Sequence, residues 1–110
     1  MTVSYFVRYQ GAADNADAFV QHYRTQHVPI LRQFPRIRGV VLHRQADWRD
    51  PFPVNPAGDV LLAQMLFDNT ADLNAALVSD ARARARADMP NFPRFTGTIS
   101  HQAMAQELFL

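Results

Sequence analysis

The sequence predicts an α+β fold in which two halves of the chain each run strand, helix, strand. Three observations support this class: short runs that alternate apolar and polar residues, one long amphipathic helical pattern, and clusters of turn-forming residues between them. The 110 residues are too few for two independent cores, and 48% hydrophobic with 19% charged residues is typical of an ordered globular chain. We therefore expect a single domain over residues 1–110.

The first strand and the first helix have the clearest patterns. Aromatic and β-branched residues alternate over 3–9, and Gly11 then marks a turn. Over 16–34 apolar residues recur at helical spacing, and Asp14 or Asn15 can cap the start of a helix with its side chain. These patterns predict a strand followed by an amphipathic helix.

A proline near the end of this helix is expected to disturb it. Pro29 has no backbone N–H and disfavours helical geometry at the preceding residue, so the helix should kink or restart just after His27. A second strand is expected over 38–48, followed by a proline-rich loop over 50–58. The strongly apolar run 59–67 then predicts a central strand.

The remaining elements form a second helical region and a last strand. Helical residues are expected over 69–89, but Ser79 and Asp80 resemble a second helix cap, so this stretch predicts two short helices. Residues 95–104 alternate again and predict a fourth strand.

This order of elements is the ferredoxin-like arrangement, a four-stranded antiparallel sheet with both helical regions on one face. The other face of the sheet has no cover within the chain. Because the strands carry apolar residues on both sides, we expect the bare face to pack against a second copy, which predicts a homodimer.

Composition excludes several classes of function. Eleven basic and ten acidic residues give a net charge of +1, which offers no general attraction to nucleic acid or to a membrane surface. The absence of cysteine excludes disulfides and thiolate-bound metals, and the histidines lack the close spacing of a metal site. No apolar run is long enough to span a membrane, and no secretory leader is apparent, so we expect a cytoplasmic protein.

His27 is the strongest candidate for chemistry, because it lies on the apolar face of the first helix with Tyr23 one turn away. One interpretation is a buried structural histidine that bonds to a backbone carbonyl, such as the Thr25 carbonyl that Pro29 leaves free. The other is a general acid or base, with Tyr23 orienting the imidazole or the substrate. The sequence leaves both interpretations open.

Other polar and aromatic residues are candidates for substrate binding. Those on or beside predicted strands could bind a carboxylate or stabilise an enolate, and an aromatic residue beside the proline-rich loop could cover an apolar ligand. They are Arg8, His43, Arg44, His101 and Trp48. Each of them could instead lie at the rim of the sheet, in solvent or in a structural role. We expect His22 and the run Arg82, Arg84 and Arg86 to be solvated.

The first helix carries a motif that resembles a known family. It reads Phe19-x-x-x-Tyr23-x-x-x-His27-x-Pro29-Ile30, followed by Phe34-Pro35 and then a strand. This resembles the opening of the EthD-like family, whose members belong to the dimeric α+β barrel superfamily. The resemblance implies a homodimer whose two sheets close into a barrel, with a ligand cleft between sheet and helices, and His27 matches the helix histidine of the family.

The family takes its name from a protein associated with ethyl tert-butyl ether degradation. Similar folds include muconolactone isomerases, polyketide cyclases and dehydratases, cofactor-free monooxygenases and haem-binding enzymes. The leading hypothesis is a small catabolic or secondary-metabolism enzyme that needs no cofactor and acts on a compact, partly apolar carbonyl, lactone or phenolic compound. The alternatives are a non-catalytic binding or accessory protein of a degradation pathway, and a haem protein with His27 as ligand.

Overall fold

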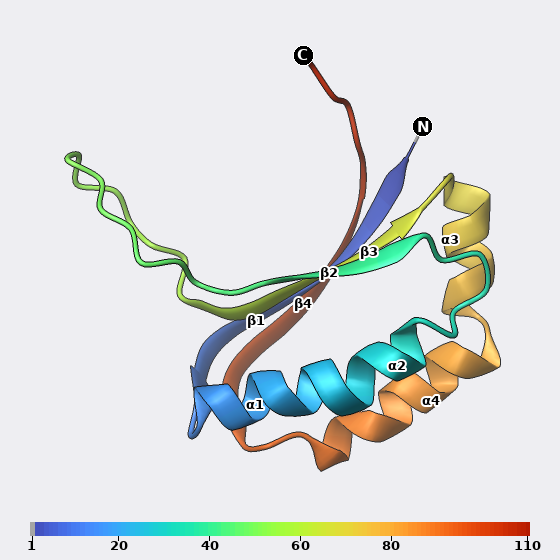
Figure 1. Ribbon diagram of the computed structural model, residues 1–110, viewed down its shortest axis with the longest axis horizontal. Coiled ribbons are helices and arrows are strands. Elements are labelled where there is room, and N and C mark those ends of the chain that lie inside the picture. The colour runs from blue at the N-terminus through green and yellow to red at the C-terminus, as the bar shows by residue number, and fades with distance from the viewer. Residues whose placement is uncertain (1) are drawn as a thin grey trace.

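The computed structural model describes residues 2–110 and shows a four-stranded antiparallel sheet in the order β2-β3-β1-β4, with the helices on one face (Figure 1). The elements are β1 (Val3–Ala13), α1 (Ala16–His22), a π-helical turn (Tyr23–His27), α2 (Val28–Leu31), β2 (Gly39–His43), β3 (Asp59–Phe67), α3 (Thr70–Leu77), α4 (Asp80–Asp88), a 3₁₀ turn (Met89–Asn91) and β4 (Phe95–Ala105). This topology confirms the predicted ferredoxin-like fold.

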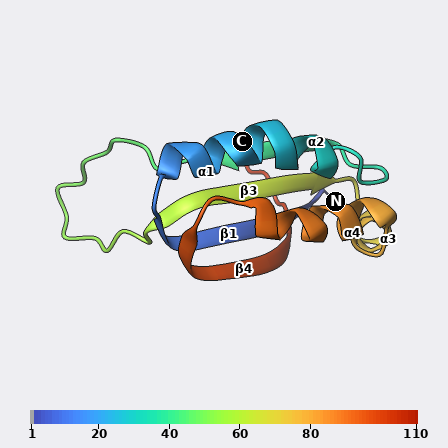
Figure 2. The same ribbon diagram turned by 90° about the horizontal axis from the view of Figure 1, so that it is seen from below.

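The core lies between the sheet and the helical layer. Tyr9 of β1 pairs with Leu61 of β3 and Val7 pairs with Ala63, and all four side chains are buried on the helical side. Figure 2 shows α1, α2 and α4 lying over the sheet on this side, with their axes roughly along the strands. The two-residue period of the strands therefore sends alternate apolar side chains into one core.

The first helix runs without a break through Pro29, but its hydrogen bonding changes. Asn15 caps α1 by accepting a hydrogen bond from the Ala18 N–H. Between Tyr23 and His27 the helix widens into a π turn, in which the Val28 N–H bonds to the Tyr23 carbonyl five residues earlier. The chain then returns to α geometry in α2, so the predicted disturbance takes the form of a wide turn before His27 and not of a kink after it.

Two predicted strand boundaries are wrong. β1 does not stop before Gly11, because Gly11 faces Gly97 of β4 and the two strands stay paired as far as Ala13. β2 ends at His43 and not near residue 48. Beyond His43 the chain leaves the sheet, Arg44 turns to pair with α1, and 44–58 form a long projecting loop (Figure 1).

The second half of the chain follows its prediction closely. β3 has the predicted bounds, and the helical region is split into α3 and α4 at Ser79. The Asn69 side chain caps α3 and the Ser79 hydroxyl caps α4, each accepting a backbone N–H of the first turn. No helix in the described part of the chain is long and apolar enough to cross a membrane.

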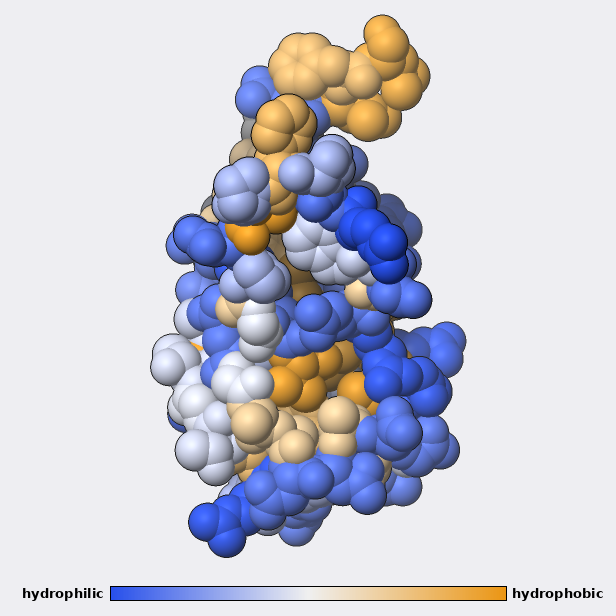
Figure 3. Space-filling view, turned by 90° about the vertical axis from the view of Figure 1, so that its left-hand side faces the viewer, coloured by the Kyte–Doolittle hydropathy of each residue, from blue (hydrophilic) through white to orange (hydrophobic). Residues whose placement is uncertain are grey.

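The face of the sheet opposite the helices is uncovered and carries several apolar side chains. They include Phe6, Val41, Leu62 and Met104, of which Val41 and Met104 are the most exposed. The loop 44–58 and the C-terminal residues project on this side of the sheet, and the tail ends in exposed Leu108, Phe109 and Leu110. Figure 3 shows these last residues as an apolar group that stands away from the body.

The close approach of β1 and β4 makes a specific prediction at Gly11. Its φ is +142°, and an added Cβ would lie 2.2 Å from the Thr96 carbonyl oxygen and 2.8 Å from the Gly97 Cα. We expect Gly11→Ala to lower the free energy of unfolding by about 2 kcal/mol or more, measured by urea denaturation. Gly39→Ala is the control, because its Cβ would meet only the Leu66 side chain at 3.6 Å. Equal stability of the two variants would contradict the proposed strain.

Candidate active site

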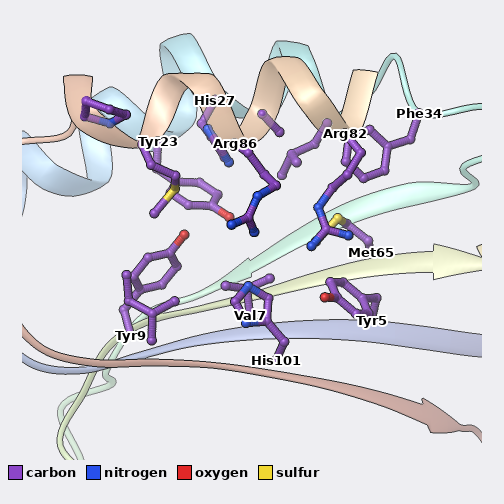
Figure 4. A pocket seen from close by; sticks show the side chains of 15 residues that line it. Tyr5, Val7, Tyr9, Tyr23, His27, Phe34, Met65, Arg82, Arg86 and His101 are labelled. Atoms are coloured by element: carbon purple, nitrogen blue, oxygen red, sulfur yellow. The ribbon is translucent and has the colours of Figure 1, made fainter. Parts of the chain in front are cut away.

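A cavity of about 360 Å³ lies between the sheet and the helices (Figure 4). This volume is near the lower end of the range for small-molecule sites, which fits a compact ligand. The lining comes from β1, β3, β4, the first helix and the turn that follows it, α4 and the 3₁₀ turn. The residues are Tyr5, Val7, Tyr9, Tyr23, His27, Leu31, Phe34, Met65, Arg82, Ala85, Arg86, Met89, Pro90, Ile99 and His101.

His27 hangs from the π turn into this cavity and is held by Asp88, the last residue of α4. The imidazole is 5% exposed, and its Nδ1 lies 2.9 Å from the Asp88 Oδ2 atom. Figure 4 shows the His27 ring directed from the helix into the cavity. The partner of His27 is thus a carboxylate, and not the Thr25 carbonyl that the sequence offered as an alternative.

Asp88 joins three donors and so ties two helical segments together. Its Oδ2 atom also accepts a hydrogen bond from the His22 Nε2 at 3.0 Å, and its Oδ1 atom accepts one from the Asn91 side chain at 3.2 Å. Burial tends to raise the pKa of Asp88, but the hydrogen bonds from His27, Asn91 and His22 outweigh it and lower that pKa. Asp88 is therefore an anion at neutral pH.

An ionised carboxylate can only accept, so it fixes the tautomer of His27. Nδ1 carries the proton that is donated to Asp88, which leaves the lone pair on Nε2. Burial lowers the pKa of His27, the Asp88 hydrogen bond and charge partly oppose this, and His22 lowers it further. The ring is therefore neutral near pH 7 and can accept a proton through Nε2.

Two tyrosines line the cavity beside this imidazole and keep their protons. Burial raises the pKa of Tyr9 to about 12, with a lowering effect from its hydrogen bond to Tyr23 and a raising effect from Asp88. Burial raises the pKa of Tyr23 well above its usual value. The Tyr23 ring is centred 4.7 Å from the His27 ring and so restricts its orientation.

Two arginines of α4 and His101 of β4 also line the cavity. The His101 side chain comes from β4, and its ring is centred 5.9 Å from the centre of the Tyr5 ring. The guanidinium carbon of Arg82 lies 5.7 Å from the centre of the same Tyr5 ring. Burial lowers the pKa of His101, and the charges of Arg82 and then Arg86 lower it further. The charges of Arg82 and Arg86 therefore reach the groups inside the cavity.

The structure brings together three of the residues chosen from the sequence. Tyr23 and His27 of the first helix and His101 of the last strand line one cavity. Sequence reasoning missed Asp88, Arg82 and Arg86. The signal for the two arginines was their spacing of four residues on α4, which places them on one face of the helix.

The other predicted binding residues lie outside this cavity. Arg8 and His43 are on the bare face of the sheet, Arg44 directly follows β2 near the first turn of α1, and Trp48 is in the projecting loop with 52% of its surface exposed. Their polar contacts are Asp59 for Arg8, Gln64 for His43 and Asp17 for Arg44. His22, expected to be solvated, is instead partly buried against Asp88, because the π turn moves it toward His27.

Comparison with known proteins places this arrangement in a family. Residues 15–95 match the EthD domain. The chain is 34% identical over 84 residues to an uncharacterized 11.0 kDa protein in the thcB-thcC intergenic region of Rhodococcus erythropolis, an alignment that covers 76% of this chain and 77% of that protein.

Solved structures share the fold at lower identity. An EthD family protein from Bacillus halodurans superposes with a TM-score of 0.74 at 20% identity, covering 97% of this chain and 100% of the other. The N63A mutant of SnoaB, a cofactor-independent oxygenase from Streptomyces nogalater, gives a TM-score of 0.67 at 12% identity, with coverage of 99% of this chain and 96% of the other. The domain match and the Rhodococcus relative together show that the chain belongs to the EthD family.

Proposed function

We propose that the protein is a small cytoplasmic enzyme that needs no cofactor and transfers a proton to or from a compact carbonyl, lactone or phenolic compound. The observation that supports this most is the His27 imidazole, which is held by Asp88 and faces a largely apolar cavity. A binding protein could use the same apolar walls, but it would have no need of a buried carboxylate that fixes one histidine tautomer. The fold shared with a cofactor-independent oxygenase is compatible with such chemistry.

In the proposed reaction His27 Nε2 accepts a proton from an acidic C–H or O–H group of the substrate. The imidazolium that forms is stabilised by the negative charge of Asp88 2.9 Å from Nδ1. The negative charge left on the substrate oxygen lies in the positive field of the two arginines of α4 that line the same cavity. Return of the proton to another position of the substrate gives isomerisation and leaves the enzyme unchanged.

We further propose that the working form is a homodimer joined through the bare face of the sheet. Phe6 of β1 and Leu62 of β3 are diagonal neighbours on this face. Phe6 pairs with Gln64, and Leu62 pairs with Arg8, two residues further along β1. The exposed apolar residues of the loop 44–58 and of the C-terminal tail project toward the same side. Packing two such faces together would remove this apolar surface from water.

Loss of the imidazole provides the test of proton transfer. A panel of compact ketones, lactones and phenols in D₂O is followed by NMR for exchange of acidic C–H protons. We expect His27→Gln to lower the exchange rate of an active compound by about 10²-fold or more. The wild-type rate should rise with pH and level off near neutrality, because the His27 pKa lies below 6.5.

The control for this experiment is His43→Gln, which changes a histidine outside the cavity that contacts Gln64. It should exchange protons at the wild-type rate. If His27→Gln folds normally and exchanges as fast as the wild type, His27 is not the base. A panel that binds without any exchange would favour the accessory-protein alternative.

Removal of the Asp88 charge should change the titration of His27. Because the Asp88 hydrogen bond and charge raise the His27 pKa against the effect of burial, we expect Asp88→Asn to lower that pKa further. The measurement is an NMR titration of the imidazole signals. Asp80→Asn, in the first turn of the same helix, is the matched control and should leave the titration unchanged. A rise of the His27 pKa in Asp88→Asn would contradict the assignment.

A charge placed on the bare face should break the dimer. We expect Leu62→Lys to elute as a monomer while the wild type elutes as a dimer, measured by size-exclusion chromatography with light scattering, because dimer formation would bury the new charge. Val78→Lys changes an 87% exposed residue at the end of α3 and should leave the dimer intact. A dimeric Leu62→Lys protein would place the interface elsewhere.

A further inference from the structure

We propose that the cavity takes an aryl carboxylate, whose carboxylate group is bound by Arg82 and Arg86 and whose aromatic ring lies against the apolar wall. The inference names the substrate class of the active site and so rests on the proposed function. It rests on two observations: two guanidinium groups of α4 line the cavity, and the residues around them are mostly apolar or aromatic.

Neither of the two guanidinium groups makes an ion pair within residues 2–110. Other arginines of the chain do so, such as Arg36 with Asp72 and Arg38 with Asp68. Arg84, between the two on the same helix, points the other way and donates a hydrogen bond to the Gln33 side chain. The two unpaired arginines thus share the cavity face of α4, and the arginine between them does not.

Both guanidinium groups enter the same cavity. Figure 4 shows Arg82 and Arg86 extending from α4 toward the sheet, with His101 on the opposite side. Arg82 lies over the Tyr5 ring, which also contacts His101. An anion between the two guanidinium groups would offset their mutual repulsion, and none of the acidic side chains within residues 2–110 lines this cavity to do so.

A carboxylate suits this position better than a more highly charged group. A guanidinium matches the two oxygens of a carboxylate with two parallel hydrogen bonds. The rest of the cavity is mostly apolar, with Leu31, Phe34, Met65 and Ile99 among its walls, and would give a phosphate dianion little of the solvation that it loses.

The aromatic part of the ligand follows from the shape and lining of the cavity. Tyr5, Tyr9 and Tyr23 offer ring faces and edges on the side of the sheet and of the first helix. A flat ring system can pack against them at low entropic cost, and a volume of about 360 Å³ admits a compact molecule. With its carboxylate at Arg82 and Arg86, such a molecule would extend toward His27.

The test compares an acid with its neutral isostere by isothermal titration calorimetry at pH 7. The probes are 2-naphthoate and 2-naphthamide, which have the same ring system and differ in charge. We expect the wild type to bind the acid at least about tenfold more tightly, and the R82Q/R86Q double variant to lose that preference. R84Q is the matched control and should keep it, because Arg84 bonds to Gln33 outside the cavity.

Equal affinities of the wild type for 2-naphthoate and 2-naphthamide would overturn the inference. It would also be overturned if R84Q lost the preference for the acid to the same extent as the double variant. His27→Gln is measured as well and should retain the preference, since it removes the base and leaves both arginines. A failure of proton transfer therefore appears in the exchange experiment, and a failure of carboxylate recognition appears here.

The titration of His101 distinguishes binding of the carboxylate inside the cavity from a general effect of removing two positive charges. In the ligand-free double variant the pKa of His101 should rise, since Arg82 and Arg86 lower it in the wild type. Addition of 2-naphthoate to the wild type should raise the same pKa, because the anion lies beside the ring. An unchanged His101 titration in both experiments would contradict placement of the carboxylate at this position.

Discussion

The shared hydrogen bonds of the Asp88 carboxylate are the interaction on which the site depends. One oxygen accepts from His22 at 3.0 Å and from His27 at 2.9 Å, and the carboxylate belongs to the end of α4. The first helix and α4 are thereby fastened at one point beside the cavity. Removal of the carboxylate would free the imidazole to rotate and leave two partly buried histidines without a partner.

This contact requires the π turn of the first helix. In a regular α-helix two residues five positions apart point about 140° from one another, so His22 and His27 could not reach the same atom. The π turn over Tyr23–His27 closes a hydrogen bond between residues five apart and brings the two rings to one carboxylate. Pro29, which cannot donate a hydrogen bond to an earlier carbonyl, makes departure from regular α geometry less costly here.

Much of the fold could be predicted because its signals are local. The alternation in 3–9 and the apolar run 59–67 each indicate a strand, and the cap at Ser79 marks the split between α3 and α4. The extent of β1 could not be predicted, because Gly11 reads as a turn unless Gly97 is known to face it. Likewise, the early end of β2 has no local signal, since the residues beyond His43 continue the predicted strand in the sequence.

The site was predictable only in part, for the same reason. His27 and Tyr23 share a helix face, so their joint position follows from spacing. Strand alternation alone could not tell that His101 enters the cavity while Arg8 and His43 do not. The pairing of His27 with Asp88 spans 61 positions and has no local signal. Arg82 and Arg86 were obscured by Arg84, since three arginines at alternate positions suggest solvated surface until the orientation of the helix is known.

The state of the His27 ring can be measured most directly by a long-range ¹H–¹⁵N correlation spectrum of the ¹⁵N-labelled protein at pH 7. We expect the neutral tautomer with the proton on Nδ1, bonded to Asp88, and an unprotonated Nε2 that faces the cavity. A proton on Nε2, or a fully charged imidazolium at this pH, would contradict the role of His27 as the base.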